Sequence, residues 1–346
     1  MPIRTGLIEE HIVAQVAWAS CLYADWSGDD EFTHGTGLEL LVETARYWRS
    51  RARVTHDGRA HIFGVIGPDE YHETVDDNAY TNVMARWNLR RAADAVEAAP
   101  HPPDVEAAEV VRWRQLADAM VDGFDPATGV YEQFAGFHRL EPLLIAEVAP
   151  RRPIAADLLL GAERVRAAQI VKQADVLMLH HQVPEEMAPG SLAANLDYYE
   201  PRTAHGSSLS PAIHAALFAR AADHDRALDA LRIAARMDLD DLTGTTSSGL
   251  HLATMGGLWQ ALAFGIAGLR SVAGRLVVDP RHPDAWAEFE VHVRHRGTRV
   301  SVRTGRSLLS VRAERPAAVT VGGAPYTADA NGLTFRRRED EWEAMR

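Results

Sequence analysis

The stretch GVIGPDEYHETVDDNAYTN, residues 64–82, decides how the rest of the chain is interpreted. It places five acids among tyrosine, histidine and asparagine side chains: Asp69, Glu70, Glu73, Asp76 and Asp77. Gly67-Pro68 cannot easily continue regular structure, because proline fixes φ and donates no amide hydrogen bond. Small and apolar residues then recur at helical spacing, so Asp76 or Asp77 is predicted to cap a helix over residues 78–99. The acids are therefore expected on a loop before a helix, where one carboxyl group can act as a general acid; an acidic solvated turn is the alternative.

Helical patterns fill most of residues 1–271. We expect helices over residues 7–27, 31–53, 78–99, 104–122, 166–180, 207–222, 225–237 and 250–268. Residues 124–165 are predicted to be irregular, because proline, glycine and aromatic residues interrupt any period there.

Near residue 272 the helical period gives way to alternation. Short runs rich in β-branched residues are separated by turn residues and predict strands: RLVVDP, FEVHVRH, TRVSVRT, LLSVRAE and AAVTVGG. The charged tail RRREDEWEAMR, residues 336–346, is predicted to be solvated. The expected fold class is mainly α, with a helical domain over residues 1–271 and a small β-sandwich-like domain over residues 272–346.

Composition excludes several classes of function. The chain of 346 residues has a formal net charge of -12, which argues against a nucleic-acid surface. Its single cysteine, Cys21, excludes an internal disulfide and suits a reducing compartment. No apolar run is long enough to span a membrane, and the first ten residues lack the apolar core of a signal peptide. We therefore expect a cytoplasmic protein with no nucleic-acid or membrane partner.

Three further clusters can carry chemistry. Lys172 and Gln173 are predicted inside an apolar helix, where the lysine either reaches the surface or hydrogen-bonds sugar hydroxyls with the glutamine. Ser207 and Ser208 precede a helix, as N-caps or as part of an anion site. Residues 243–251, TGTTSSGLH, suit a phosphate pocket with His251, or a capped helix with a core histidine. No metal site or cofactor is expected, because no histidine, cysteine or acid cluster has ligand spacing.

Read together, these stretches resemble glycoside hydrolase family 65, the maltose, trehalose and kojibiose phosphorylases. The matching pieces follow the family's order: RTGLIEEHI (4–12), residues 64–82, YEQFAGF (131–137), KQADV (172–176), YYEPRTAHGSSLSP (198–211) and MDLDD followed by SSGLHLATMGGLW. The resemblance implies an (α/α)6 barrel with a β-sandwich before it and a small β domain after it. It also implies that Glu70 is the general acid.

The resemblance implies roles for the other clusters as well. Lys172 and Gln173 would hold the donor glucose, and Ser207, Ser208 and His251 would bind phosphate. The family's reaction is inverting phosphorolysis of an α-glucosidic disaccharide, which gives β-glucose 1-phosphate and a free sugar. Because phosphate is the nucleophile, one protein carboxyl group suffices, whereas an inverting hydrolase needs a second carboxylate about 6.5–9.5 Å away.

Two alternatives stay open beside the phosphorylase. An inverting α-glucoside hydrolase would use Glu185, Glu186 or Glu200 as its base. A non-catalytic carbohydrate-binding remnant would keep only the fold. The identity of the disaccharide does not follow from these motifs.

The resemblance begins partway through the family's catalytic domain. The β-sandwich, the first barrel helices and a Trp-Asp segment that binds the donor glucose have no counterpart, and Gln15 stands where the family commonly has an acid. We therefore expect an incomplete (α/α)6 toroid with exposed apolar helix faces. Such a chain would be an inactive fragment of a longer protein, or would need a partner such as a second copy or the missing N-terminal part.

Overall fold

The computed structural model describes residues 5–100, 104–339 and 341–345. Arg4 of the first matching motif, and Asp340 and Arg346 of the tail, lie outside the described residues. The chain divides into two compact units: residues 1–21 with 31–210, and residues 22–30 with 211–346. The first is mainly helical, and the second carries helices followed by sheets. Helix-rich structure before a β-rich end agrees with the predicted fold class, whereas the incomplete (α/α)6 toroid stays a prediction.

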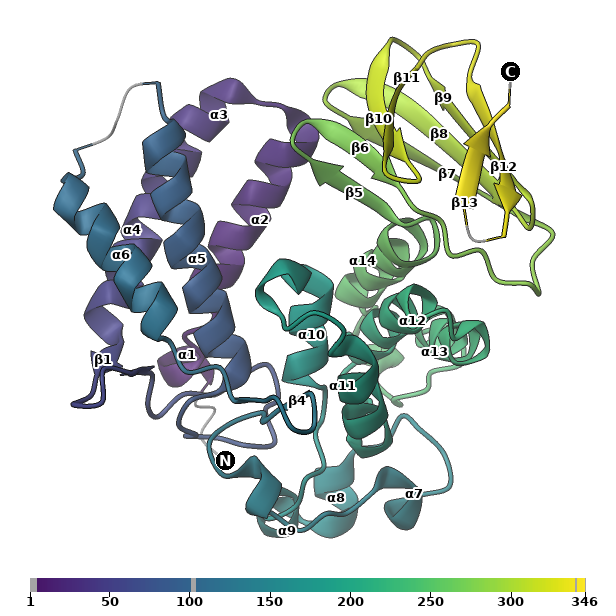
Figure 1. The fold of residues 1–346 in the computed structure, drawn as a ribbon. Helices are drawn as coiled ribbons and strands as arrows, with labels where there is room; N and C mark the ends of the chain where they lie inside the picture. The colour runs from purple at the N-terminus through teal and green to yellow at the C-terminus, as the bar shows by residue number, and fades with distance from the viewer. Residues whose placement is uncertain (1–4, 101–103, 340, 346) are drawn as a thin grey trace. The chain divides into compact units, whose positions relative to one another are not determined.

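The first helices are α1 (Thr5–Ile8), α2 (Ile12–Ser27), α3 (Asp30–His34), α4 (Thr36–Arg51), α5 (Ala79–Ala98) and α6 (Ala107–Ala119). Residues 22–30, at the end of α2 and the start of α3, belong to the second unit. Helices α4, α5 and α6 of the first unit pack side by side (Figure 1). The helices predicted over residues 7–27 and 31–53 are each interrupted once. The second break falls at Gly35, where a Cβ atom would lie only 2.8 Å from the Glu31 carbonyl oxygen. Helix α5 packs against α4 and α6, and most of its residues are buried.

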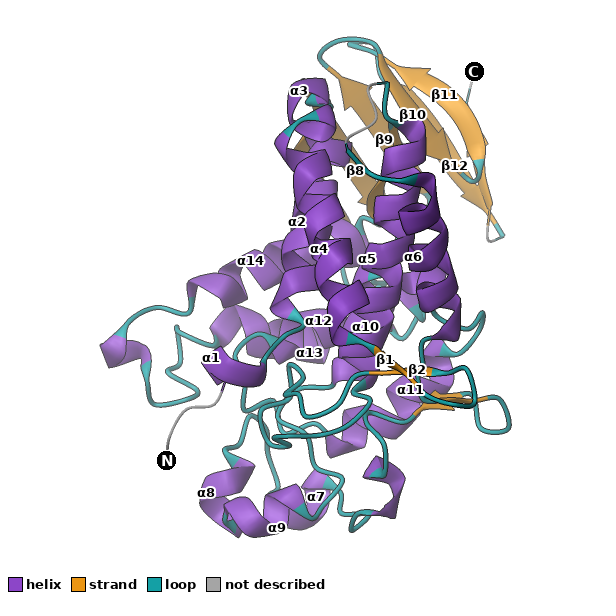
Figure 2. Ribbon diagram, turned by 90° about the vertical axis from the view of Figure 1, so that its left-hand side faces the viewer, coloured by secondary structure: helices purple, strands orange, loops and turns teal. Residues whose placement is uncertain are grey.

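Short elements fill the predicted irregular region, and the connecting loops gather around them in Figure 2. These elements are β3 (Phe124–Asp125), β4 (Val130–Tyr131), η1 (Phe137–Arg139), α7 (Ile145–Val148), α8 (Ala156–Leu160) and α9 (Ala162–Arg166). They are followed by α10 (Asp175–Gln182), η2 (Pro184–Glu186), α11 (Leu192–Tyr199) and η3 (Glu200–Arg202). The short strands β1 (Arg53–Val54) and β2 (Ala60–His61) lie earlier, between α4 and α5.

The helix predicted over residues 166–180 is wrong in its first half. Helix α9 ends at Arg166 and α10 begins at Asp175, so Lys172 and Gln173 lie on a loop. The amide of Val171 donates to the Arg202 carbonyl, and the amide of Lys172 donates to a side chain, so neither is available to a helix. Tertiary hydrogen bonds have overridden the local helical pattern.

The second unit continues with α12 (Ser210–Arg220), α13 (His224–Arg236), η4 (Thr246–Ser248), α14 (Leu252–Gln260) and the π-helical turn η5 (Ala261–Ile266). These elements confirm the helices predicted over residues 207–222, 225–237 and 250–268. Among the described residues, no helix is long and apolar enough to cross a membrane.

Two sheets form the end of the chain. The strands are β5 (Leu269–Val272), β6 (Arg275–Val278), β7 (Glu288–His295), β8 (Thr298–Gly305), β9 (Leu308–Ala313), β10 (Ala317–Val321), β11 (Ala324–Ala328), β12 (Leu333–Arg338) and β13 (Glu341–Ala344). Their order is β11-β10-β6-β5 in one sheet and β13-β12-β9-β8-β7 in the other. Every pair is antiparallel except β10 with β6.

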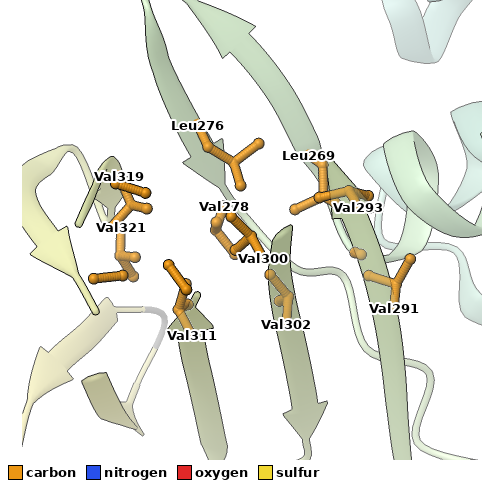
Figure 3. Close-up of a cluster of buried hydrophobic side chains, with 14 of the residues drawn as sticks. Leu269, Leu276, Val278, Val291, Val293, Val300, Val302, Val311, Val319 and Val321 are labelled. Atoms are coloured by element: carbon orange, nitrogen blue, oxygen red, sulfur yellow. The ribbon is translucent and has the colours of Figure 1, made fainter. Parts of the chain in front are cut away.

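The alternating residues of both sheets turn one face inward (Figure 3). Leu276, Val278 and Val319 of the four-stranded sheet meet Val300 and Val311 of the five-stranded sheet in one buried cluster. Phe335, directly before the charged tail, is fully buried, and β12 pairs with β13. The described residues of the tail are exposed, except for the half-buried Arg337 and Trp342, so the predicted solvated tail is confirmed although it forms strands.

Candidate active site

The loop over residues 64–78 is folded tightly onto α10. Val65 and Val75 form an isolated bridge that closes the loop at its base. A Cβ atom on Gly67 would lie 2.2 Å from Asp175 Oδ2 and 2.4 Å from Asn78 Nδ2. Only glycine fits between these two polar groups, so the glycine fixes how closely the loop approaches α10.

Helix α5 is capped by Asn78, which corrects the prediction of Asp76 or Asp77. The Asn78 side chain accepts from the Thr81 amide at 2.9 Å. Asp77 instead adopts φ 50° and lies 2.7 Å from His61 Nδ1, while Asp76 accepts from the Gly64 amide at 2.9 Å. The two acids stabilise the loop rather than the helix end.

The Asp69 carboxylate makes several of the hydrogen bonds that hold this loop in place. Its carboxylate is almost fully buried, and one oxygen, Oδ1, accepts from the amides of Lys172 at 2.8 Å and Tyr71 at 3.4 Å. The other oxygen, Oδ2, lies 2.7 Å from His72 Nδ1 and accepts from Gln133 Nε2 at 3.0 Å. A buried carboxylate needs such partners to offset its desolvation. Asp69 therefore ties the backbone on either side of Glu70 to the loop that carries Lys172.

Asp175 anchors the same region from α10. It is fully buried and accepts from the Asp69 amide and from Asn78 Nδ2, each at 2.7 Å. Burial, and then the nearby Asp69 carboxylate, raise the pKa of Asp175 well above its ordinary value. Asn78 thus joins the cap of α5 to the acid at the start of α10.

Glu70 projects from this anchored backbone into solvent. Its side chain is 47% exposed, and its Oε2 lies 2.7 Å from Lys172 Nζ. Gln173 donates from Nε2 to the Pro68 carbonyl at 2.5 Å. The structure therefore brings together three of the predicted site residues, Glu70, Lys172 and Gln173.

The segment that carries Ser207 and Ser208 runs beside Lys172. Val171 bridges to Thr203, and the Ala204 amide donates to the Val171 carbonyl at 2.8 Å. A Cβ atom on Gly206 would lie 3.1 Å from the Tyr71 hydroxyl and 3.5 Å from Lys172 Cγ. The two serines therefore follow a glycine that packs against Tyr71 and the stem of Lys172.

Glu9 is a carboxylate near Glu70 that the sequence patterns did not single out. The Ile66 amide donates to the Ile8 carbonyl at 3.0 Å, which places the segment before Glu9 on the Glu70 loop. The pKa of Glu9 is raised, first by burial and then by the charge of Glu70, while Lys172 lowers it. The only signal in the sequence was its place in the matching motif RTGLIEEHI.

His251 belongs to the other compact unit, and there it is held by Asp238. Its Nδ1 lies 2.5 Å from Asp238 Oδ1, and its amide donates to Asp238 Oδ2 at 2.9 Å. These hydrogen bonds hold the pKa of Asp238 below its ordinary value. The other ring nitrogen, Nε2, lies 3.3 Å from Thr245 Oγ1. The imidazole is thus oriented with Nε2 toward the hydroxyl-rich loop.

The acids that a hydrolase could use as a base are placed differently from one another. Glu186 is held by Arg86 at 2.7 Å and by Arg90 at 2.8 Å, and its side chain is only 7% exposed. Glu200 pairs with Arg152, whereas Glu185 is exposed. Two of the three candidates are therefore neutralised by guanidinium groups.

Comparison with known proteins gives consistent matches along the chain. Residues 2–260 match the glycosyl hydrolase family 65 central catalytic domain, and residues 269–328 match the glycosyl hydrolase family 65 C-terminal domain. The kojibiose phosphorylase of Caldanaerobacter subterraneus subsp. tengcongensis is 33% identical over 90% of this chain and 42% of its own length. The alpha,alpha-trehalose phosphorylase of Geobacillus stearothermophilus is 33% identical over 86% of this chain and 40% of its own length.

A solved structure agrees with these matches. A putative kojibiose phosphorylase from the human microbiome superposes with a TM-score of 0.84 at 26% identity, over 94% of this chain and 46% of that one. The chain thus spans less than half the length of the relatives it matches.

Proposed function

Because the chain belongs to glycosyl hydrolase family 65, we propose that it is the catalytic part of an inverting glycoside phosphorylase. Its substrates would be an α-glucosidic disaccharide and phosphate, and its products β-glucose 1-phosphate and a free sugar. The observation that carries the proposal is the exposed Glu70 carboxyl, which is fixed by a buried network and paired with Lys172 at 2.7 Å. The phosphorylases among its relatives support the choice of reaction.

Glu70 is the group that donates a proton to the glycosidic oxygen in this proposal. Of the two acids in the GPDEY motif, Glu70 is open to solvent and Asp69 is buried. Lys172 Nζ lies too close to Glu70 Oε2 for a sugar hydroxyl to fit between them. A donor sugar would therefore contact the pair from its solvent-exposed side.

Lys172 and Gln173 would then hold the donor glucose through hydroxyl hydrogen bonds. Ser207 and Ser208 would contribute to the phosphate side, and their position after Gly206 beside Lys172 supports this assignment. His251 is assigned to the phosphate with its Nε2 turned away from Asp238. With phosphate as the nucleophile, no second protein carboxylate is required.

An inverting hydrolase is the second candidate, and Glu9 and Glu185 are the observations that favour it. Neither is held in an arginine ion pair in the described part of the chain, so either could activate a water molecule. A carbohydrate-binding protein without turnover is the third. Such a protein would bind a disaccharide and release no product.

The deciding experiment incubates the protein with kojibiose, trehalose, maltose and nigerose, each with and without phosphate. The phosphorylase forms glucose 1-phosphate only when phosphate is present. Free glucose released at the same rate in both conditions would establish the hydrolase instead. Binding of a disaccharide without any product would leave the carbohydrate-binding protein.

A further inference from the structure

The outer face of the five-stranded sheet contains a hollow of about 770 Å³. Strands β7, β8 and β9 form its floor, and the turn before β12 closes one side. Polar side chains surround it: His292, Arg294, Arg299, Ser301, Arg312 and Glu314. All of them belong to one compact unit, so the hollow is defined by that unit alone.

The register of the strands explains why the face is hollowed. Ser301 lies in the middle strand, with His292 directly opposite on β7 and Arg312 directly opposite on β9. Side chains on one face of a sheet stand roughly perpendicular to it, so a small serine between longer neighbours leaves a depression. The walls of this depression end in charged groups, and the serine hydroxyl lies at its floor.

The charges around the hollow are unbalanced. Among the lining residues, three arginines and one carboxylate, Glu314, give 3 − 1 = 2 excess positive charges, and Glu290 lies just outside, 3.7 Å from His292 Nε2. In the described part of the chain, no ion pair joins Arg294, Arg299 or Arg312 to an acid. Arg303, on the same face of β8 but outside the hollow, is paired with Glu290 at 2.7 Å. The imbalance is therefore local to the hollow.

Arg294 and Arg299 are also direct cross-strand partners. Like charges in this position destabilise an antiparallel pair, and a protein of net charge -12 has ample acids to place there instead. A bound dianion would turn this repulsion into two favourable contacts, because guanidinium groups bind phosphate oxygens in a fork geometry.

We propose that this hollow binds a phosphate-bearing small molecule. A phosphate monoester carries close to two negative charges at neutral pH, which matches the excess of two positive charges. Ser301 supplies a hydroxyl donor, and the volume leaves room for a substituent beside the phosphate. The ligand is therefore inorganic phosphate or a sugar phosphate. An extended polyanion would meet the acids Glu288 and Glu290 next along β7.

The test compares Arg299→Thr with Arg303→Thr, which is matched for strand, face and residue type. Threonine is favourable in strands, so neither change weakens β8 through propensity. Calorimetric titrations use inorganic phosphate, glucose 1-phosphate, glucose 6-phosphate and, as a neutral control, glucose. Melting temperatures are measured with and without each compound.

In Arg299→Thr we expect phosphate compounds to bind the hollow at least about tenfold more weakly, while Arg303→Thr binds like the parent. Without ligand, Arg299→Thr should melt higher than the parent by on the order of 1 °C, because the cross-strand repulsion is gone. Tighter binding of a sugar phosphate than of phosphate identifies the substituent as part of the ligand. Identical phosphate binding and identical ligand-induced stabilisation in Arg299→Thr and the parent would overturn the proposal. The proposal does not depend on turnover, because every readout is a binding or stability measurement.

Discussion

Glu70 is the residue on which the proposed chemistry depends. Replacement by glutamine keeps the size of the side chain and its contact with Lys172 but removes the transferable proton. We expect Glu70→Gln to lower kcat/KM for phosphorolysis by at least about 10²-fold, the scale of general acid catalysis. Steady-state kinetics on the preferred disaccharide measure this. A rate within a few-fold of the parent would remove Glu70 from the role.

Replacing Asp69 tests whether the buried hydrogen bonds around its carboxylate position Glu70. In Asp69→Asn, the new NH2 group points at a hydrogen-bond donor whichever way the amide turns, because the Lys172 and Tyr71 amides donate to one carboxylate oxygen and Gln133 donates to the other. We expect kcat to fall about 10-fold to 10²-fold while KM changes little, since misplacement of a catalytic group costs rate. The pH dependence of the remaining activity should keep its shape.

The matched control is Asp76→Asn, which lies on the same loop but is exposed and accepts from a single amide, that of Gly64. It should keep parental kcat and KM. Equal losses in the two variants would mean that any change in the loop disturbs the site, and Asp69 would have no special role.

The motifs predicted that Lys172 and Gln173 lie near the Glu70 loop, and the structure places Lys172 Nζ at Glu70 and Gln173 Nε2 at the Pro68 carbonyl. The roles of these residues, and of Ser207, Ser208 and His251, stay predictions. The roles of Asp69 and Asp175 depend on contacts between residues about a hundred positions apart, which no local pattern encodes. The pairing of His251 with Asp238 likewise required the fold.

Among the elements, the start of α5 depends on one residue that makes two stabilising interactions. Asn78 caps the helix and also donates to the buried Asp175 at 2.7 Å. We expect Asn78→Ala to lower the free energy of unfolding by about 2–4 kcal/mol, from the lost cap and the lost hydrogen bond to a buried acid. Urea unfolding followed by circular dichroism gives the value.

Asp223→Ala provides the comparison for that loss. Asp223 caps α13 by accepting from the Arg226 amide at 3.2 Å. Its removal should cost only about 0.5–1 kcal/mol, the usual value for an exposed cap. A cost for Asn78→Ala no greater than that for Asp223→Ala would contradict the coupling of α5 to Asp175.

The elements themselves were largely predictable. Helix α5 and strands β6 to β10 appear where periodicity placed them, because each buries one regular face. The failure at Lys172 and Gln173 has a physical cause, because the neighbouring backbone amides bond to other segments instead of to a helix.

For the molecule as a whole, stability should fall in acid partly through His11. This side chain is buried, its Nδ1 lies 3.3 Å from the Ile66 carbonyl oxygen, and its Nε2 lies 3.6 Å from Glu9. Burial lowers the pKa of His11 from its ordinary value of 6.5 to about 4. The unfolded chain therefore binds a proton more readily than the folded one between these values.

The sign follows from this difference. Neutral His11 makes its full contribution to the free energy of unfolding above pH 6.5. This contribution, on the order of 2–3 kcal/mol in total, is lost as the pH falls toward 4. The raised pKa of Glu9 acts in the opposite direction, since it favours proton binding by the folded state. The free energy of unfolding, measured from pH 7 to 4, should fall less steeply with pH in His11→Gln than in the parent. An identical slope in both would contradict a neutral buried His11.

The central claim is that Glu70 protonates a glycosidic oxygen while phosphate attacks from the opposite side of the sugar. Proton NMR of the anomeric region tests it in one reaction of kojibiose with phosphate. The account predicts β-glucose 1-phosphate as the first product, no product without phosphate, and none in Glu70→Gln on the same timescale. Formation of α-glucose 1-phosphate, or of glucose at a rate independent of phosphate, would contradict it.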